Sequence, residues 1–257
     1  MISAPFFSEI GWELLRWQGH IRHIKPESVY CAEGHEYLYE DFCTPIPCRA
    51  NIVKKDKWKA ENHSDRHEGW WDVKFDIKPS KEICENPNLK QEFFQYGRKR
   101  YGGKMEYDIL LHHRTAKRKC DKKTGDRTYK HWEELCKHFK GLKIGWIGTR
   151  AESGVPVDIG NDLRGLPLQT VADLCANSKF VMGPSSGIAH FANLCDCKAL
   201  VWTDKRKWNL GGKKGSNWRR YMTAWNPFKT NNIVLDDDGW QPSAERVLKA
   251  IEKNHLL

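Results

Sequence analysis

No part of the sequence carries the long apolar run that a membrane-spanning helix needs. Such a helix takes about 20 consecutive apolar residues, whereas hydrophobic residues make up only 39% of this chain and are scattered along it. The N-terminal stretch MISAPFFSEIGWELL also lacks the basic segment and the following apolar stretch of a secretory signal. We therefore expect a cytoplasmic protein, in the host cytoplasm if the chain is viral.

Paired cysteines with metal-binding spacing are also missing. The nine cysteines are irregularly spaced: Cys43 and Cys48 are five residues apart, and Cys195 and Cys197 flank a single Asp. Neither pair is half of the CxxC…CxxC pattern that is typical of a structural zinc site. We therefore expect reduced thiols and no metal ligands.

Positive charge is what the chain has in excess. Its 43 Lys and Arg residues outnumber its 33 Asp and Glu residues, for a net charge of +10. This balance favours anionic partners such as nucleotide phosphates, nucleic acid or an acidic glycan. The 12 tryptophans interleave with basic residues over 54–71 and 205–225. Such a mixture binds unstacked bases or sugars, although it also fits a Lys-rich surface over buried tryptophans.

The second part of the chain alternates between strand-like and helix-like segments. It begins after Gly102–Gly103, which the sequence predicts as a hinge. Strands are expected over 107–114, 142–149, 179–182, 198–202 and 232–237, with a further short strand within 155–165. Helices are expected over 129–141, 168–178, 187–195 and 242–254. This alternation predicts a parallel sheet covered by helices on both faces, and hence an α/β fold.

The first part of the chain is less regular. We expect a helix within 6–24, a strand over 28–32, and turn and helix signals over 33–49. A strand over 70–77 and a helix over 88–101 would follow. A long loop is expected later, over 204–232.

Residues 181–191, VMGPSSGIAHF, form the most informative stretch. Gly183–Pro184 ends an apolar strand, and Ser185 or Ser186 would cap the helix that follows. A helix N-terminus presents unpaired N–H groups and a partial positive charge, which suit a phosphate. The alternative is a structural cap with His190 in the core.

Polar residues end three predicted strands. His112, His113 and Arg114 end one strand, and Thr149 with Arg150 ends the next. The segment from Ser185 to Gly187 ends a third. Because the carboxyl ends of parallel strands share one edge of the sheet, where ligands bind, these groups predict an anion site there.

Three segments of the chain resemble GT-B glycosyltransferases, most closely the ADP-heptose:lipopolysaccharide heptosyltransferase-like family. They are DILLHHRTAK…DRTYKHWEEL, DLRGLPLQTVADLCANSKFVMGPSSGIAHFANLCDCKALVW and FFSEIGWELLRWQGHIR. The chain departs from that family at two turns. Ser185 stands where the family usually has an acidic residue, and Trp12 follows Gly11 where the family often has a catalytic Asp.

The resemblance implies two Rossmann-like domains whose parallel sheets face each other across a cleft. Residues 1–103 would form a reduced acceptor-side domain, 104–241 a nucleotide-sugar-binding domain, and 242–257 a terminal helix. The implied activity moves a sugar from a nucleotide sugar to an acceptor hydroxyl. It needs no cofactor or metal besides the donor, and a single carboxylate base fits inversion better than retention.

The resemblance also implies roles for particular residues. The donor would be bound by Gly11, His113, Arg114, Arg127, Thr149, Arg150, Ser185, Ser186, Gly187 and His190. Lys122 or Lys123 could take the place of Arg127. Glu9 or Glu13, which flank Gly11–Trp12, would be the catalytic base, with Glu9 slightly preferred. In the other interpretation, Glu13 is a first-turn glutamate that the helix dipole favours.

Three alternatives remain open at this level. The anionic acceptor could be a glycan or a modified base in DNA, since some bacteriophage enzymes with this fold glycosylate DNA. The protein could instead be a non-catalytic nucleotide- or nucleic-acid-binding module. A zinc-dependent function is the weakest of the three.

Overall fold

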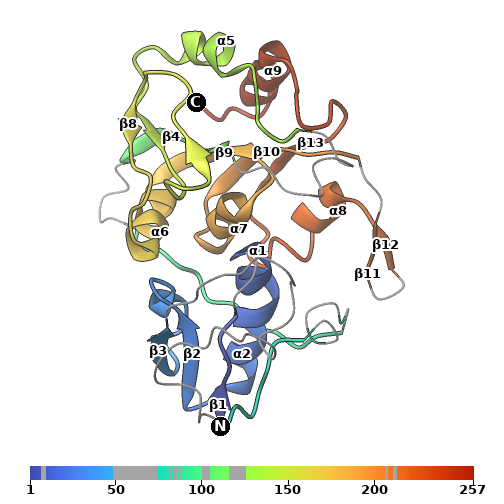
Figure 1. The fold of residues 1–257 in the computed structure, drawn as a ribbon. Coiled ribbons are helices and arrows are strands. Elements are labelled where there is room, and N and C mark those ends of the chain that lie inside the picture. The colour runs from blue at the N-terminus through green and yellow to red at the C-terminus, as the bar shows by residue number, and fades with distance from the viewer. Residues whose placement is uncertain are drawn as a thin grey trace. The chain divides into compact units, whose positions relative to one another are not determined.

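The structure, a computed structural model, consists of two compact units (Figure 1). Unit 1 comprises Met1–Phe94 with Asn209–Lys213, and unit 2 comprises Gln95–Trp208 with Lys214–Leu257. The described residues are 1–6, 10–48, 74–80, 83, 86, 88–99, 105–115, 126–205, 208–210 and 213–257, with the backbone alone for 208–210 and 213–215.

Unit 1 contains a small parallel sheet in the order β1-β2-β3. Its strands are β1 Ile2–Ser3, β2 Ser28–Ala32 and β3 Thr44–Cys48. The expected strand over 28–32 is confirmed. The expected turn and helix over 33–49 is wrong in its last part, because β3 pairs with β2 along its whole length. Pro45 and Pro47 are tolerated there because β3 lies at an edge of the described sheet, where a missing N–H is not needed.

One continuous helical segment follows β1. It consists of α1 Ile10–Trp12, the π-helical turn η1 Glu13–Trp17 and α2 Gln18–Ile24, so the helix expected within 6–24 is confirmed over its described part. Leu14, Trp17 and Ile21 are fully buried, and they form its core-facing side. The helix ends at Lys25, whose φ of 55° is left-handed and whose N–H donates to the Ile21 carbonyl. A short 3-10 helix, η2 Glu36–Leu38, lies between β2 and β3.

The helix expected over 88–101 is wrong, because residues 88–99 contain no helix. The backbone N–H groups of this segment bond to other elements instead of to the preceding turn. Glu92 N–H donates to the Gly19 carbonyl within unit 1, and Tyr96 N–H donates to the Leu194 carbonyl within unit 2. Of the strand expected over 70–77, residues 70–73 lie outside the described residues. The rest has one bridge, between Ile77 and Ser3.

Unit 2 is built on a parallel sheet in the order β13-β10-β9-β4-β6-β8 within the described residues. Its strands are β4 Tyr107–Leu111, β6 Ile144–Trp146, β8 Asn161–Asp162, β9 Ser178–Pro184, β10 Lys198–Trp202 and β13 Ile233–Leu235. A short antiparallel pair joins β5 His113–Arg114 to β7 Ser153–Gly154. The predicted α/β fold with a parallel sheet is therefore confirmed.

Helices cover both faces of this sheet, and the two-residue period of its strands explains how (Figure 1). In β10, Leu200 and Trp202 face the core shared with α5 and α9, while Ala199 and Val201 face α7 and α8. The helices are α5 Trp132–Cys136 with η3 Lys137–Phe139, α6 Leu168–Ala176, α7 Gly187–Leu194, α8 Asn217–Tyr221 and α9 Ala244–Lys253.

The region expected to be a loop over 204–232 holds regular structure. Strands β11 Trp208–Leu210 and β12 Lys213–Gly215 pair with each other, and α8 follows. The Ser216 hydroxyl accepts a hydrogen bond from Arg219 N–H and so caps α8. Ser243 caps α9 by the same kind of bond, from Arg246 N–H. In the described part of the chain, every helix is too short or too polar to cross a membrane.

Candidate functional site

The polar residues that were predicted to end three strands do follow three neighbouring strands of the unit 2 sheet. Strand β4 lies between β9 and β6, and both pairings are parallel. Their carboxyl ends therefore lie at one edge of the sheet, which is where ligands bind in open α/β sheets. His112 N–H donates to the Met182 carbonyl at 2.9 Å and ties the ends of β4 and β9 together.

The turn from β9 into α7 leaves the start of the helix without a side-chain cap. Ser186 occupies the N-cap position with extended backbone, but its hydroxyl makes no cap bond. Ser185 is buried, and its Oγ accepts from the Tyr221 hydroxyl at 2.9 Å. The expectation that one of these serines caps the helix is therefore wrong. The Ser186 hydroxyl makes no cap bond, and the Ser185 hydroxyl is hydrogen-bonded to Tyr221 instead. The N–H groups at the start of α7 are not occupied by a serine side chain, as an anion-binding helix terminus requires.

His190 lies one turn into α7 within an aromatic cluster. Its ring centroid is 4.4 Å from that of Trp225 and 5.3 Å from that of Tyr221. The residue is 7% exposed, and its Nδ1 atom has no hydrogen-bond partner among the described residues. Burial, with a smaller contribution from the positive charge of Arg220, lowers the pKa of His190 to about 3. The imidazole is therefore neutral at pH 7.

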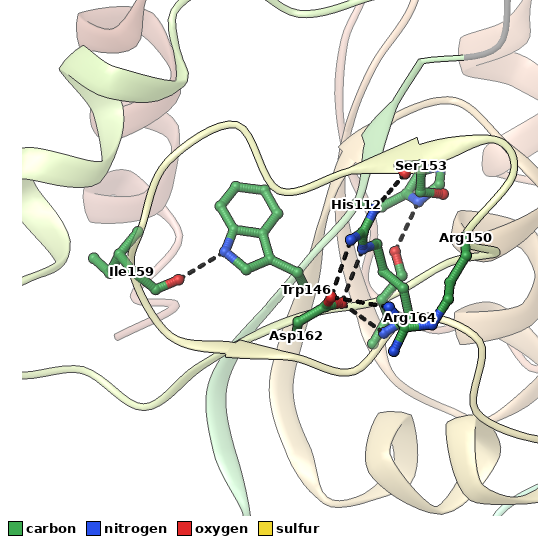
Figure 2. Close-up of polar contacts among 8 residues, drawn as sticks. His112, Trp146, Arg150, Ser153, Ile159, Asp162 and Arg164 are labelled. Atoms are coloured by element: carbon green, nitrogen blue, oxygen red, sulfur yellow. Dashed lines mark hydrogen bonds and ion pairs between the residues drawn. The ribbon is translucent and has the colours of Figure 1, made fainter.

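Two adjacent histidines at the end of β4 are also buried and neutral. His112 Nδ1 donates to the Ile147 carbonyl at 3.1 Å (Figure 2), and burial lowers the pKa of His112 to about 4. His113 Nδ1 accepts from the Trp132 indole N–H at 2.7 Å, and burial lowers the pKa of His113 as well. Because Nδ1 of His113 is an acceptor, its proton is on Nε2.

Cationic side chains surround the same edge. Arg114 is buried in β5, with 6% of its surface exposed. The Arg127 guanidinium lies over the Trp240 ring, 4.4 Å from its centroid, and the Arg220 guanidinium lies 4.7 Å from the Trp225 centroid. The charge of Arg127 acts on the Tyr221 hydroxyl. These guanidinium groups give the edge a positive potential that suits a multiply charged anion.

Thr149 and Arg150 are exposed and lie in the loop after β6, and Figure 2 shows Arg150 beside Asp162. Thr149 Oγ1 accepts from Glu152 N–H, and Arg150 Nη1 lies 3.3 Å from Asp162 Oδ2. Arg164 donates to Asp162 and to the Ser153 carbonyl, which joins the loop to β8. Hydrogen bonds from Arg164 hold the pKa of Asp162 well below its usual range. Ion pairs with Asp162 and the hydrogen bond to Ser153 thus tie the loop to β7 and β8.

Most of the remaining predicted residues belong to unit 1. Gly11 lies in α1, and Glu9 is outside the described residues, as are Lys122 and Lys123 in unit 2. Glu13 lies in η1 and is 1% exposed. Its two carboxylate oxygens face His35 and Tyr39. The structure therefore buries Glu13 behind a histidine that the sequence did not single out.

Sequence reasoning also missed several aromatic and cationic neighbours in unit 2. Tyr221 and Arg220 lie around His190 together with Trp225, which the sequence marked only as part of a stretch that could bind bases or sugars, and Trp132 donates to His113. The first three belong to 205–225, where basic residues and tryptophans interleave, so the composition of that stretch was a usable signal. An open depression of about 680 Å³ beside η3 and residues 156–159 contains none of the predicted site residues. Among the described residues, no three His, Cys, Asp or Glu side chains cluster closely enough to hold a metal ion.

Comparisons with known proteins identify the fold. No family model and no curated protein matches the chain. Several solved structures do. ADP-heptose LPS heptosyltransferase II of E. coli is 13% identical and has a TM-score of 0.56, covering 100% of this chain and 98% of its own. The dodecameric iron-containing glycosyltransferase TibC from enterotoxigenic E. coli is 9% identical, with a TM-score of 0.55 over 99% of this chain and 76% of its own.

A third similar structure is a family 9 glycosyl transferase from Veillonella parvula. It is 9% identical, with a TM-score of 0.52 over 98% of this chain and 96% of its own. Identities this low are evidence of fold, not of activity. Together with the parallel sheets of both units, these similarities show that the chain has the α/β GT-B fold of heptosyltransferase-like glycosyltransferases.

Proposed function

We propose that the protein is a glycosyltransferase that takes a sugar from a nucleotide-sugar donor and transfers it to an acceptor hydroxyl. One observation carries this proposal: the start of α7 has no side-chain cap and follows β9 at the carboxyl edge of a GT-B-type sheet, where β5 with buried Arg114 also contacts β9. Proteins of similar fold are named for ADP-heptose, which makes an ADP-linked sugar the first donor to test.

In this proposal, the donor diphosphate lies against the first N–H groups of α7. As the bond from the anomeric carbon to the diphosphate breaks, negative charge develops on the leaving oxygen. The amides around Ser186–Gly187 and the guanidinium groups of Arg114 and Arg127 stabilise that charge. His113, as a neutral donor at Nε2, and His190 add polar contacts. Thr149 and Arg150 line the nucleoside end.

The proposal extends to how transfer occurs. The leaving diphosphate is stabilised by helix amides and arginines, so the chemistry is proposed to need no bound metal. One proton acceptor in unit 1 fits a single displacement, which inverts the anomeric configuration. The net charge of +10 favours an anionic acceptor, either a glycan or DNA carrying a modified base.

Thermal unfolding with a panel of ADP-, UDP- and GDP-sugars tests the proposal. A ligand at one hundred times its Kd stabilises the folded state by about 2.7 kcal/mol, which is a rise in Tm of roughly 5–10 °C for a chain of this size. Arg114→Gln should weaken the selected donor at least about tenfold, the effect of losing about 1.4 kcal/mol of charged hydrogen bonding.

The matched control is Arg246→Gln, which removes an exposed arginine of the same unit. A panel without any stabilising nucleotide sugar contradicts the donor assignment.

The acceptor is tested by binding to duplex DNA across a salt series. A steep loss of binding with salt supports DNA, and absent binding favours a glycan. Binding of donor without any release of nucleoside diphosphate would support the non-catalytic alternative.

A further inference from the structure

Unit 1 has a polar cluster at the carboxyl edge of its own parallel sheet. Strand β2 ends at Ala32, and the turn through Gly34, whose φ of 85° favours glycine, brings the chain to His35. The helical segment after β1 begins at Ile10 and carries Glu13 in its first turn. Since β1 and β2 are parallel neighbours, Glu13 and His35 both follow carboxyl ends of adjacent strands. This edge is where open parallel sheets bind ligands.

Glu13 is an almost fully buried carboxylate with two side-chain partners. His35 Nδ1 lies 2.7 Å from Glu13 Oε2, and the Tyr39 hydroxyl donates to Oε1 at 2.9 Å. A buried carboxylate without partners would cost several kcal/mol, and these two contacts offset that cost. The carboxylate only accepts, which fixes the proton of neutral His35 on Nδ1 and leaves a lone pair on Nε2.

The two partners of the Glu13–His35 pair differ in how far their side chains are exposed to solvent. The Glu13 side chain is 1% exposed, whereas the His35 side chain is 25% exposed. The buried carboxylate can therefore orient the imidazole, while the imidazole can reach a molecule from solvent. Glu13 lies in a π-helical turn. Such turns are rare in proteins as a whole, but those that occur are often found at functional sites. In the surface pair His23–Glu92 neither side chain is buried, because they are 38% and 45% exposed.

We propose that His35 Nε2 is the general base of the transfer reaction and that Glu13 is its positioning residue. This inference rests on the proposed function. The acceptor oxygen forms a bond to the anomeric carbon of the donor, and the bond from that carbon to the diphosphate oxygen breaks, with its electron pair leaving on the diphosphate. The acceptor proton moves to His35 Nε2. Nδ1–H stays bonded to Glu13, which stabilises the imidazolium, and solvent later removes the proton.

The surroundings of His35 predict a pH dependence for this step. Glu13, on η1, raises the pKa of His35 through its negative charge and its hydrogen bond, although burial opposes the shift. Glu36, on η2, adds to the rise, and Tyr39 faces the pair as a neutral hydroxyl. The base is the neutral imidazole. The rate is therefore full above the raised pKa and falls as the pH drops through it.

The decisive variant is His35→Asn. The Asn side-chain N–H matches the position of Nδ1 and still donates to Glu13, but it cannot accept a proton. With the nucleotide sugar selected by thermal shift, release of nucleoside diphosphate should fall about 10²- to 10⁴-fold. The donor KM and the donor-induced rise in Tm should not change. His23→Asn, which removes the surface histidine of the same unit, should keep the wild-type rate.

A second variant keeps the proposal falsifiable if His35→Asn folds poorly. Glu13→Gln keeps an oxygen that can accept from His35 but removes the charge, so the acidic limb of the pH–rate profile should move to lower pH. NMR titration of the His35 imidazole should show the same downward move without any assay of activity.

The possible outcomes separate the two proposals. If the wild-type chain binds and turns over a donor while His35→Asn keeps its rate, His35 is not the base and the proposed function stands. If the acidic limb of the pH–rate profile and the NMR titration of His35 are both unchanged in Glu13→Gln, Glu13 is not a positioning residue for His35. If the wild-type chain neither binds nor cleaves any nucleotide sugar, both proposals are overturned.

Discussion

The buried neutral histidines of unit 2 should make the fold sensitive to mild acid. Burial lowers the pKa of His190 to about 3 and that of His112 to about 4, against an ordinary value of 6.5. The folded state therefore binds fewer protons than the unfolded state once the pH falls below 6.5, and stability is lost as the pH falls. At pH 5, the linkage relation gives a loss of about 2 kcal/mol for each histidine, or about 4 kcal/mol together.

Substituting His190 isolates one of these contributions. His190→Phe keeps an aromatic ring against Tyr221 and Trp225, and it removes a buried nitrogen that has no hydrogen-bond partner among the described residues. At pH 7 its stability should equal or slightly exceed that of the wild-type chain. Between pH 7 and pH 5 it should lose about 2 kcal/mol less than the wild type, because the contribution of His190 is gone.

Urea unfolding followed by tryptophan fluorescence at pH 7, 6 and 5 measures both losses. The control is His138→Gln, which removes an exposed histidine of the same unit and should track the wild-type chain. The result that refutes the reasoning is an equal loss of stability from pH 7 to pH 5 in His190→Phe and the wild type. That result would mean that the imidazole is protonated in the folded state, despite its burial.

Two further substitutions test the packing that holds the site. A Cβ added at Gly183 would lie 2.5 Å from the His112 carbonyl oxygen, so Gly183→Ala should lower the free energy of unfolding by about 1–3 kcal/mol; an unchanged Tm would contradict this close approach of β4 and β9. Trp132→Phe removes the indole N–H that donates to His113 and part of the contact with Trp146. It should cost about 1–3 kcal/mol in thermal unfolding, and a smaller loss would show that the buried bond to His113 contributes little.

The sequence predicted the unit 2 sheet well because its signals are local. In β10, small and large apolar residues alternate between two faces that are both buried. Gly183 and Pro184 end β9 before a helix whose first N–H groups face the same edge. The parallel order of the strands follows from their alternation with helices. It places the carboxyl ends of β4, β6 and β9 at one edge of the sheet without any knowledge of long-range contacts, whereas the position of β4 between β9 and β6 comes from the structure.

Other features depend on partners that are distant in the chain. Residues 88–99 have apolar spacing that suits a helix, but the N–H groups of Glu92 and Tyr96 bond to Gly19 and Leu194 instead. Ser185 follows the pattern of a helix cap, yet Tyr221, 36 residues later, takes its hydroxyl. In each case a tertiary hydrogen bond replaces the local one that the pattern predicts. No property of the segment alone reveals that exchange.

The same limit explains why Glu13 was singled out and His35 was not. A glutamate beside a glycine at the start of a helix is visible in the sequence, but its burial behind an imidazole 22 residues away is not. The structure also gives the two sheet edges different chemistry. In unit 2 the edge carries arginines and helix amides, which in the proposed reaction would stabilise a departing diphosphate. In unit 1 it carries a carboxylate–imidazole pair, which in the proposed reaction would accept a proton. Glycosyl transfer needs both tasks at once, and this division of chemistry between two parallel sheets is what the proposed reaction requires of the chain.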